Sequence, residues 1–299
     1  MSIPAPGDHG GDGSRLADAL GVDVSEVLDL SASLNPVAPD PAPVVAAHLE
    51  ALRRYPDPRP AVDTLARCMG VDPDLLVLTN GGSEAISLVA AERPVGRVDE
   101  PEFSLYRRHL GRLDATGPRW RSNPHNPTGN LAGPGERAEV WDEAFWPLAT
   151  GSWTRGDWRS GSIVLGSLTK LLACPGLRLG YVLCPDPDLA RRLRRRQPRW
   201  SVNGPAVAAL TDLLAPVDLP AWAEAVAGLR RDLVAVLRRA GLEPRPSDAN
   251  WVLVAAPGLR DRLASRAVCV RDCSSFGLPG TVRIAVPDRD GLARLAAAL

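Results

Sequence analysis

The sequence predicts an α/β protein in which helices flank a mainly parallel sheet, with a smaller α+β domain after it. Short apolar runs at residues 75–79, 95–98, 163–165 and 179–183 have the length of buried strands. Segments with helical periodicity alternate with these runs, which favours parallel strands joined by crossover helices. From residue 205 onward the order changes to long helices followed by short strands, which indicates a second unit.

The first half of the chain contains three expected helices. Apolar positions recur at helical spacing over residues 42–54 and 60–69, and Gly70 is placed to end the second helix. The strand expected at 75–79 is followed by glycines and then by an apolar helical run at 85–91. This strand–turn–helix order is the unit from which parallel sheets are built.

The second half predicts a smaller α+β unit. Helices are expected at 205–214, 221–240 and 291–299, and strands at 251–254, 268–270 and 282–286. We therefore expect an N-terminal segment at 1–44 that packs with the small domain, a large domain at 45–204 and a C-terminal small domain at 205–299.

Composition excludes several classes of partner. The 299 residues have a formal net charge of zero, so nothing global favours nucleic acid or a membrane surface. No uninterrupted apolar run approaches the roughly 20 residues of a membrane span. The first 15 residues lack the basic-then-apolar order of a signal peptide. The arginine-rich run at 191–196 is expected to be a solvated helix face.

The cysteines indicate a reducing environment. There are five, an odd number, and none forms a C-x-x-C pair. Free thiols in the cytoplasm are the simplest interpretation. We expect no metal site, because no His/Cys cluster has ligand spacing.

The chemistry is concentrated around Lys170. This lysine follows the apolar run 163–165, with Ser167 and Thr169 just before it and Arg178 eight residues after it. A lysine amine can form a Schiff base with an aldehyde cofactor. Hydroxyls and an arginine suit a phosphate group, because the guanidinium binds phosphate through a planar fork. A lone lysine near a strand end is usually only solvated, so the whole constellation carries the argument.

The string from Ser167 to Tyr181 resembles the cofactor-lysine segment of the fold-type-I pyridoxal phosphate (PLP) enzymes, which include the aspartate-aminotransferase superfamily. The resemblance implies the fold of that superfamily, PLP as the cofactor and Lys170 as the residue that binds it covalently.

A second phosphate-binding feature lies after the expected strand at 75–79. Asn80-Gly81-Gly82-Ser83 connects this strand to a helix, and a helix N-terminus presents free backbone N–H groups to an anion. Alone, this is more often a plain connection. Together with Ser167, Thr169 and Arg178, it indicates that Gly82 and Ser83 bind the cofactor phosphate.

Two further strings resemble cofactor-binding segments of the superfamily. Asn123-Pro124-His125-Asn126-Pro127-Thr128-Gly129 resembles the loop whose asparagine contacts the phenolic oxygen of PLP, which implies that role for Asn126. The Asp142-Glu143-Ala144-Phe145 string implies that Asp142 faces the pyridine nitrogen, where a carboxylate keeps the nitrogen protonated. Many relatives have tyrosine where this chain has Phe145, so one hydrogen bond to the phenolic oxygen is lost.

The resemblance also implies an aromatic contact and a dimer. Within the string Glu100-Pro101-Glu102-Phe103-Ser104-Leu105-Tyr106, it implies that Phe103 stacks on the cofactor ring, with core packing as the alternative. Tyr55 lies in a string, residues 53–58, whose tyrosine reaches the phosphate of the neighbouring subunit. We therefore expect a homodimer with a shared active site.

Four shorter strings narrow the resemblance to one branch. They are His9-Gly10-Gly11-Asp12, Ser31-Ala32-Ser33-Leu34-Asn35-Pro36, Trp200-Ser201-Val202-Asn203 and Arg271-Asp272-Cys273-Ser274-Ser275-Phe276. Together they look like the threonine-phosphate decarboxylase family of cobalamin biosynthesis, which is similar to histidinol-phosphate aminotransferase. The resemblance implies O-phospho-L-threonine as substrate and 1-amino-2-propanol phosphate as product.

Four residues are candidates for binding this small phosphorylated amino acid. A carboxylate and a phosphate both require cationic donors, for which Arg271, Arg283 and His9 are suitable. Asn35 is a further candidate for the carboxylate.

The chain departs from the family in its spacing. Only 22 residues separate Phe103 from Asn126, and 12 separate Asn130 from Glu143, about half of what the resembling enzymes use. We therefore expect a shortened large domain that has lost part of its sheet. Besides the decarboxylase, the sequence leaves open a histidinol-phosphate type aminotransferase and a non-catalytic protein on a PLP fold.

Overall fold

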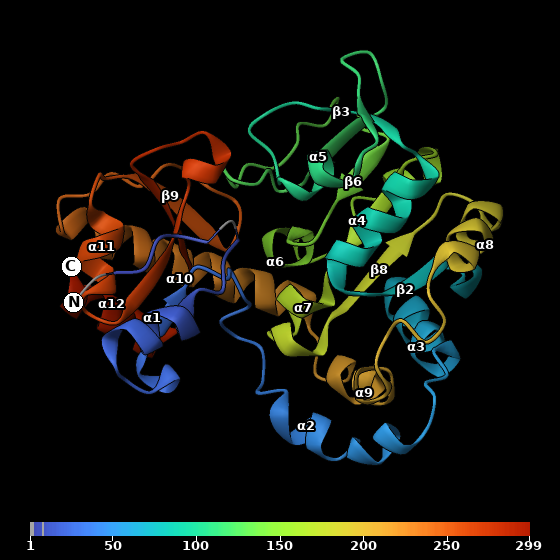
Figure 1. Ribbon diagram of the computed structural model, residues 1–299, viewed down its shortest axis with the longest axis horizontal. Helices are drawn as coiled ribbons and strands as arrows, with labels where there is room; N and C mark the ends of the chain where they lie inside the picture. The colour runs from blue at the N-terminus through green and yellow to red at the C-terminus, as the bar shows by residue number, and fades with distance from the viewer. Residues whose placement is uncertain (1–2, 8) are drawn as a thin grey trace.

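The computed structural model describes residues 3–7 and 9–299 and confirms the predicted α/β class. Within these residues the chain forms a seven-stranded sheet and a four-stranded sheet, each in its own domain (Figure 1). The larger domain lies on the right of Figure 1, and the smaller domain, on the left, contains both the N-terminal helix and the C-terminal helix.

The large sheet is mainly parallel, as predicted. Its strands are arranged in the order β2-β8-β7-β6-β5-β3-β4, and β8 is antiparallel to both of its neighbours. The strands are β2 (Leu76–Asn80), β3 (Val95–Val98), β4 (Arg112–Leu113), β5 (Arg119–Ser122), β6 (Val140–Asp142), β7 (Ile163–Gly166) and β8 (Leu179–Leu183).

Helices cover both faces of this sheet. Because side chains alternate along a strand, Leu76 and Leu78 pack with α3 and α9, whereas Val77 packs with α4 and α8 on the opposite face. The helices of this domain are α2 (Ala42–Ala46), α3 (Arg59–Met69), α4 (Gly81–Glu92), α5 (Leu105–His109), α6 (Trp146–Thr150), α7 (Leu168–Leu171), α8 (Pro187–Arg196) and α9 (Gly204–Leu214).

Local sequence sets the ends of several helices. Asp186 accepts a hydrogen bond from the Leu189 N–H at the start of α8, and Pro187 is at the first helical position. Gly70 ends α3 in the left-handed conformation (φ +66°), as predicted. The single helix expected at 42–54 is interrupted: α2 ends at Ala46, His48 has a non-helical backbone, and a short 3₁₀ helix follows at Leu49–Arg53.

The small domain has a mixed sheet in the order β1-β10-β11-β9. The N-terminal segment contributes α1 (Gly13–Leu20) and β1 (Leu28–Leu30), and β1 pairs in parallel with β10. This part of the N-terminal segment therefore packs with the small domain. The remaining elements are β9 (Trp251–Ala255), α11 (Leu259–Ala264), β10 (Val268–Asp272), β11 (Thr281–Ala285) and α12 (Arg289–Ala298).

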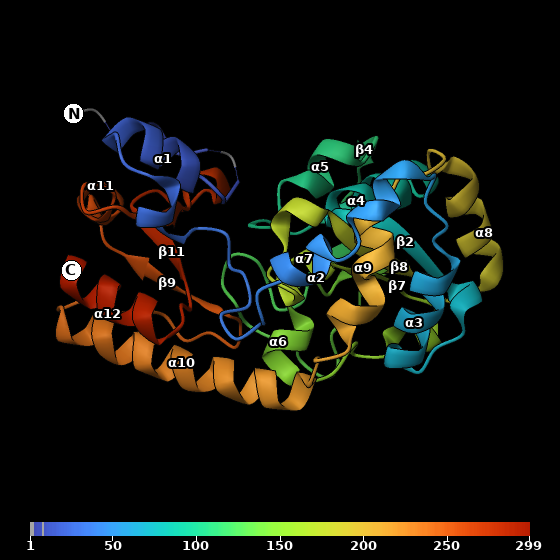
Figure 2. The same ribbon diagram turned by 90° about the horizontal axis from the view of Figure 1, so that it is seen from below.

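One long helix, α10 (Leu219–Arg239), joins the two domains and runs along both of them (Figure 2). Its first apolar residues, including Trp222 and Val226, pack in the large core with α9, and Leu229, Leu233 and Leu237 pack in the small core. The change from one core to the other therefore lies within α10, whereas we predicted a boundary before α9, at residue 205.

Among the described residues, no single helix is long and apolar enough to span a membrane. Only α9 and α10 taken together pass a test of length and composition, and they are bent by 89° relative to each other. The helix expected at 221–240 is α10, and its buried residues recur at helical spacing: Leu219, Trp222, Val226, Leu229, Leu233 and Leu237.

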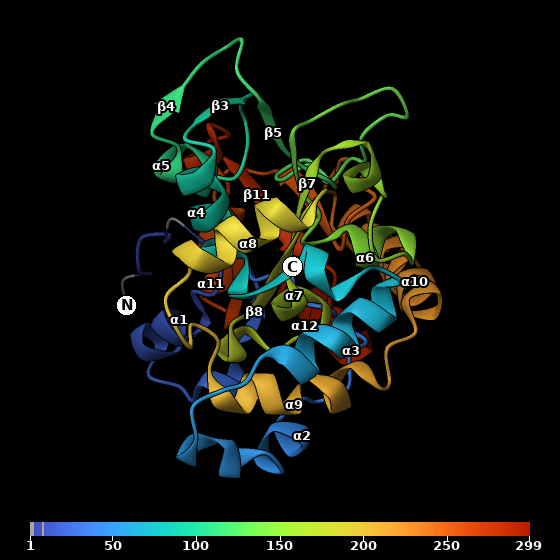
Figure 3. The same ribbon diagram turned by 90° about the vertical axis from the view of Figure 1, so that its right-hand side faces the viewer.

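The shortening of the large domain lies in its connections. The gaps around Asn126 contain β4, β5 and β6, so these strands are present, but residues 123–139 join β5 to β6 with neither helix nor strand. At this end of the sheet, loops extend beyond β3, β4 and β5 without a helix above them (Figure 3). Asn126, which lies in this connection, is therefore held by a loop and not by a helix or strand.

We predict that Gly180→Ala destabilises the fold by about 1–3 kcal/mol, because overpacking forces the backbone to shift. A Cβ at Gly180 of β8 would lie 2.6 Å from the Gly81 carbonyl carbon and 2.8 Å from the Gly82 nitrogen, both backbone atoms. The measurement is the free energy of unfolding in urea. Gly135→Ala, where a Cβ meets nothing within 4 Å, is the control, and equal stability of the two variants would contradict the prediction.

Candidate active site

A cavity of about 540 Å³ lies between the two domains and contains most of the predicted site residues. Its walls come from the N-terminal segment, the start of α4, the strand ends of β5, β6 and β7, and the small-domain strands β10 and β11. The predicted residues that line it are His9, Gly82, Ser83, Phe103, Asn126, Asp142, Ser167, Thr169, Lys170, Arg178, Arg271 and Arg283.

One end of the cavity is an anion-binding cup at the start of α4. Gly81 has φ +77°, a conformation that favours glycine, and a Cβ there would overlap the Arg178 guanidinium. The first N–H groups of α4 have no partner within the helix, and Gly82, Ser83 and Ser167 border the same space. Thr169 also lines the cavity, but its hydroxyl donates to the Leu179 carbonyl at 3.0 Å.

Lys170 lies on the short helix α7, directly after β7. Its Nζ donates to the Ala32 carbonyl at 2.7 Å and lies 5.8 Å from the centroid of the Phe145 ring. Burial, with the nearby charges of Arg283 and Arg178, lowers the pKa of Lys170 to about 8. A much larger fraction of this amine is therefore unprotonated and nucleophilic near neutral pH than in an exposed lysine.

Asp142 lines the cavity from the end of β6. Its Oδ2 accepts a hydrogen bond from the Tyr106 hydroxyl at 2.7 Å, and its Oδ1 accepts one from the Ala144 N–H at 3.0 Å. Burial raises the pKa of Asp142, and a cationic ring nitrogen placed beside it would favour the carboxylate. Phe145 is buried and packs edge-on against Trp251, with ring centroids 4.6 Å apart.

Arg283 brings a buried positive charge from β11 into the cavity. Its Nη1 donates to the Asn126 Oδ1 at 2.6 Å, and its guanidinium lies 5.0 Å from the centroid of the Trp251 ring. The Nε of Arg283 is buried without a hydrogen-bond partner, and burial lowers the pKa of this side chain to about 10. Because Asn126 accepts through its oxygen, its amide NH₂ is left to donate.

Arg271 and His9 lie on the small-domain side of the cavity. Arg271 on β10 is the direct cross-strand partner of Arg283 on β11, so both side chains leave the same face of the sheet. The Arg271 Nη2 donates to the Ser275 hydroxyl at 2.7 Å. The His9 ring meets the Phe103 ring edge-on at 5.6 Å, which connects the N-terminal segment to the large domain.

Two predicted residues lie outside the cavity. Asn35 is buried, and its side-chain amide donates to the Leu171 carbonyl at 2.9 Å, so it holds the helix that carries Lys170 and does not face the substrate space. Tyr55 is 77% exposed and stacks on Trp200 at 4.2 Å, away from the cavity of its own chain.

Three polar residues at the site were not predicted. Tyr106 and Ser122 line the cavity, and Glu102 is buried directly behind Ser122. All three lie within or beside strings that the sequence singles out, but only the aromatic Phe103 and the amide Asn126 were selected there. A charged residue between a proline and an aromatic residue was the available signal for Glu102.

Comparison with known proteins decides the family. The family described as aminotransferase class I and II matches residues 120–299. The chain is 30% identical to the threonine-phosphate decarboxylase of Salmonella typhimurium, over 97% of this chain and 95% of the relative. The chain belongs to the aminotransferase class I and II family. This alignment extends over 350 positions, more than the chain has residues, so the relative contains segments that are missing here.

Two further members give the range of the resemblance. The histidinol-phosphate aminotransferase 1 of Dechloromonas aromatica is 28% identical over 96% of this chain and 92% of its own length. The structure of histidinol-phosphate aminotransferase from Sinorhizobium meliloti in complex with pyridoxal 5'-phosphate superposes with a TM-score of 0.84 at 22% identity, covering 100% of this chain and 94% of the other. The fold-type-I architecture is thereby confirmed.

Enzymes of this family are PLP-dependent, and the cavity fits the cofactor. The glycine cup and Arg178 would hold the phosphate, Lys170 would bind the aldehyde carbon, and Asp142 would face the ring nitrogen. Phe103 borders the space for the ring, and the Asn126 amide is left to donate to the phenolic oxygen. A bound PLP supplies an aldehyde for the substrate amine and a ring that accepts electrons from the bond that breaks.

We predict that the rate at which the cofactor-free protein captures PLP rises with pH and levels off above about pH 8. The reason is that only unprotonated Lys170 reacts, and its pKa is lowered to about 8, whereas an ordinary lysine has a pKa of about 10.4. Stopped-flow absorbance between pH 6 and 10 measures this rate. Nα-acetyl-lysine under the same conditions corrects for titration of the cofactor, and a protein profile that keeps rising to pH 10 would contradict the prediction.

Proposed function

We propose that this family member catalyses the PLP-dependent decarboxylation of O-phospho-L-threonine to 1-amino-2-propanol phosphate, a step of cobalamin biosynthesis. The observation that carries the proposal is the pairing of Arg271 with Arg283 on adjacent antiparallel strands that face the cavity. Side chains that start directly opposite each other are about 5 Å apart at Cβ. Two guanidinium groups carried by such neighbouring positions suit a small substrate with two anionic groups.

The two arginines are suited to different anions. Arg283 is buried, lies near Lys170 and has an unpaired Nε, which suits the carboxylate on the carbon that bears the reacting amine. Arg271 lies next to Ser275, so a guanidinium and a hydroxyl together suit a phosphate, which accepts several hydrogen bonds. His9 lines the same cavity and provides a further donor for the phosphate.

The residues of the large domain would supply the chemistry. With a pKa of about 8, Lys170 is present in both forms near neutral pH: its ammonium form would donate a proton to the carbon that loses CO₂, and its amine form would accept one in transamination. Asp142 would keep a positive charge at the ring nitrogen. Arg271 and Arg283 would orient the substrate at the cofactor, and the orientation of its carboxylate would select between loss of CO₂ and transamination.

Similarity supports the decarboxylase, with one competing function. The relative at 30% identity is a threonine-phosphate decarboxylase, and the absence of a hydroxyl at Phe145 suits that branch. A histidinol-phosphate aminotransferase at 28% identity shares the same motifs, so transamination is the second candidate.

We also propose that the protein is a cytoplasmic homodimer. Four large apolar residues have exposed side chains that a second copy would cover: Leu49, Leu52, Tyr55 and Trp200. Tyr55 and Trp200 stack on each other. Tyr55 on this surface would then reach the cofactor phosphate of the partner. The five cysteines are all free thiols, which suits a reducing compartment.

The test of the proposed reaction is CO₂ release from O-phospho-L-threonine by the PLP-loaded protein without any keto acid. We expect stoichiometric CO₂ and 1-amino-2-propanol phosphate, and no product from Lys170→Ala, which should also lose the absorbance of the lysine-bound cofactor. Absence of CO₂, with conversion of added 2-oxoglutarate to glutamate, would replace the proposal with transamination. Absence of both reactions would contradict an enzymatic function.

A second prediction separates substrate binding from cofactor binding. Arg283→Ala should weaken substrate binding about 100-fold, because it removes a charged donor pair from a buried site, while changing PLP affinity far less. Arg178→Ala should do the opposite, since Arg178 belongs to the phosphate cup. Titrations of PLP and of substrate against both variants measure this, and parallel losses of both affinities in both variants would contradict the assignment.

A further inference from the structure

A buried carboxyl group lies behind the cavity without any role in the chemistry described above. Glu102 is 2% exposed, and burial raises its pKa to about 8. Among the residues that the structure describes, Glu102 has one ion-pair candidate, the His125 ring, whose Nε2 is 3.7 Å from Oε1. This Nε2 lies only 2.8 Å from the Pro101 carbonyl and donates there. Burying a carboxyl group without an ion-pair partner is costly, so the group requires an explanation.

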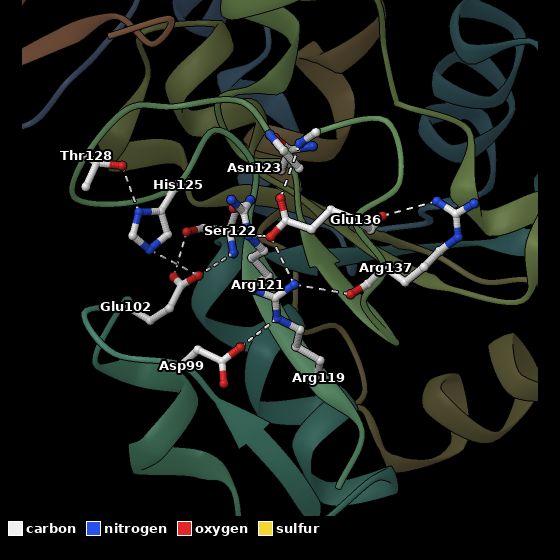
Figure 4. Close-up of polar contacts among 12 residues, drawn as sticks. Asp99, Glu102, Arg119, Arg121, Ser122, Asn123, His125, Thr128, Glu136 and Arg137 are labelled. Atoms are coloured by element: carbon white, nitrogen blue, oxygen red, sulfur yellow. Dashed lines mark hydrogen bonds and ion pairs between the residues drawn. The ribbon is translucent and has the colours of Figure 1, made fainter. Parts of the chain in front are cut away.

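All three donors to Glu102 come from segments that carry cofactor-facing residues. The Ser122 N–H donates to Oε1 at 2.9 Å, and the Ser122 hydroxyl donates to Oε2 at 2.6 Å. The Phe103 N–H donates to Oε2 at 3.2 Å. Figure 4 shows the Glu102 side chain directed toward Ser122, at the end of β5, and His125, in the turn that follows. One side chain thus joins the loop before α5 to the end of a strand 20 residues away in the sequence.

The hydrogen bonds continue from Ser122 to Asn126. The Asn126 N–H donates to the Ser122 hydroxyl oxygen at 2.8 Å. A serine hydroxyl has a single hydrogen, so donation to Glu102 turns its lone pairs toward Asn126. The Asn126 side chain in turn accepts from Arg283. The orientation of the residue assigned to the phenolic oxygen is therefore linked through Ser122 to Glu102.

The segment of Glu102 is also connected to Asp142, the residue assigned to the ring nitrogen of PLP. The segment that follows Glu102 carries Phe103, on the cavity wall, and Tyr106, whose hydroxyl holds Asp142 at 2.7 Å. A second link reinforces the attachment, because His125 bonds the Pro101 carbonyl through Nε2 and accepts from the Thr128 hydroxyl through Nδ1. Residues 123–139 contain no helix, so these hydrogen bonds are what attaches the turn at His125 to the segment of Glu102.

We propose that Glu102 is a positioning residue for PLP, which acts through Ser122 to fix the turn that presents Asn126 to the cofactor. The proposal depends on the cofactor that the family uses and not on whether the reaction is decarboxylation or transamination. Glu102 touches neither cofactor nor substrate in this assignment.

The experiment is a double-mutant cycle with Glu102→Gln, Ser122→Ala and the double variant. Each single change disrupts the hydrogen bond between Glu102 and Ser122, so each should raise the dissociation constant of PLP about ten-fold, the effect of a hydrogen bond of about 1.4 kcal/mol. If the two residues act through one path, the double variant should also lose about ten-fold and not 100-fold. The absorbance maximum of bound PLP, which reports on its phenolic oxygen, should shift alike in all three.

A matched control separates positioning from stability. Ser162→Ala removes a hydroxyl that donates to the Ala138 carbonyl at 2.8 Å, outside the cavity, and should leave PLP affinity and spectrum unchanged. Multiplicative losses in the cycle, or unchanged affinity and spectrum in Ser122→Ala, would overturn the proposal. If Glu102→Gln does not fold, Ser122→Ala alone still tests the proposal. A lower unfolding midpoint of Ser122→Ala, together with wild-type PLP affinity and spectrum, would overturn the positioning role.

Discussion

The buried charge of Arg283 is the constraint on which the site depends. A guanidinium costs free energy when it is removed from water, and in the described part of the chain Arg283 forms no ion pair with a carboxylate. The face of Trp251 and the carbonyl oxygen of Asn126 compensate partly. The remaining attraction is available to an incoming anion. Burial and, to a smaller extent, the same charge lower the pKa of Lys170, so the group proposed to bind the substrate also favours the unprotonated amine.

Buried acidic residues perform the complementary task on the large domain. Asp142 accepts a hydrogen bond from the Tyr106 hydroxyl. Its neighbour Glu143 accepts the Arg155 backbone N–H at 3.2–3.3 Å, and the Arg155 guanidinium packs on the Trp141 ring. The Tyr106 donor to Asp142 lies on α5, whereas the Arg155 donor to Glu143 lies in the loop that follows α6. Hydrogen bonds to these two buried carboxyl groups therefore connect the end of β6 to two different segments of the large domain.

The sequence predicted the features that depend on local pattern. The strands at 95–98 and 179–183 and the helix ended by Gly70 were placed correctly, because apolar runs and capping residues specify them locally. β5 and β6 were missed, since strands of three or four residues within a loop-rich stretch have little periodicity. Asn35 was assigned to the substrate from its string, but the tertiary structure uses its amide to hold α7. The sequence around Glu102 marks it as unusual, but its partner Ser122 lies 20 residues away, so the local pattern could not show what it contacts.

The choice between the two candidate reactions follows from how the domains are joined. The anion-binding arginines belong to the small domain, whereas Lys170 and Asp142 belong to the large one. The direction of the substrate carboxylate relative to the ring is therefore set by the interdomain geometry, which α10 and the Asn126–Arg283 hydrogen bond fix. The relatives at 30% and 28% identity carry the names of two different reactions, and the cavity residues suit both. The position of the substrate carboxylate relative to Lys170 and Asp142, and not the list of cavity residues, would therefore decide between decarboxylation and transamination.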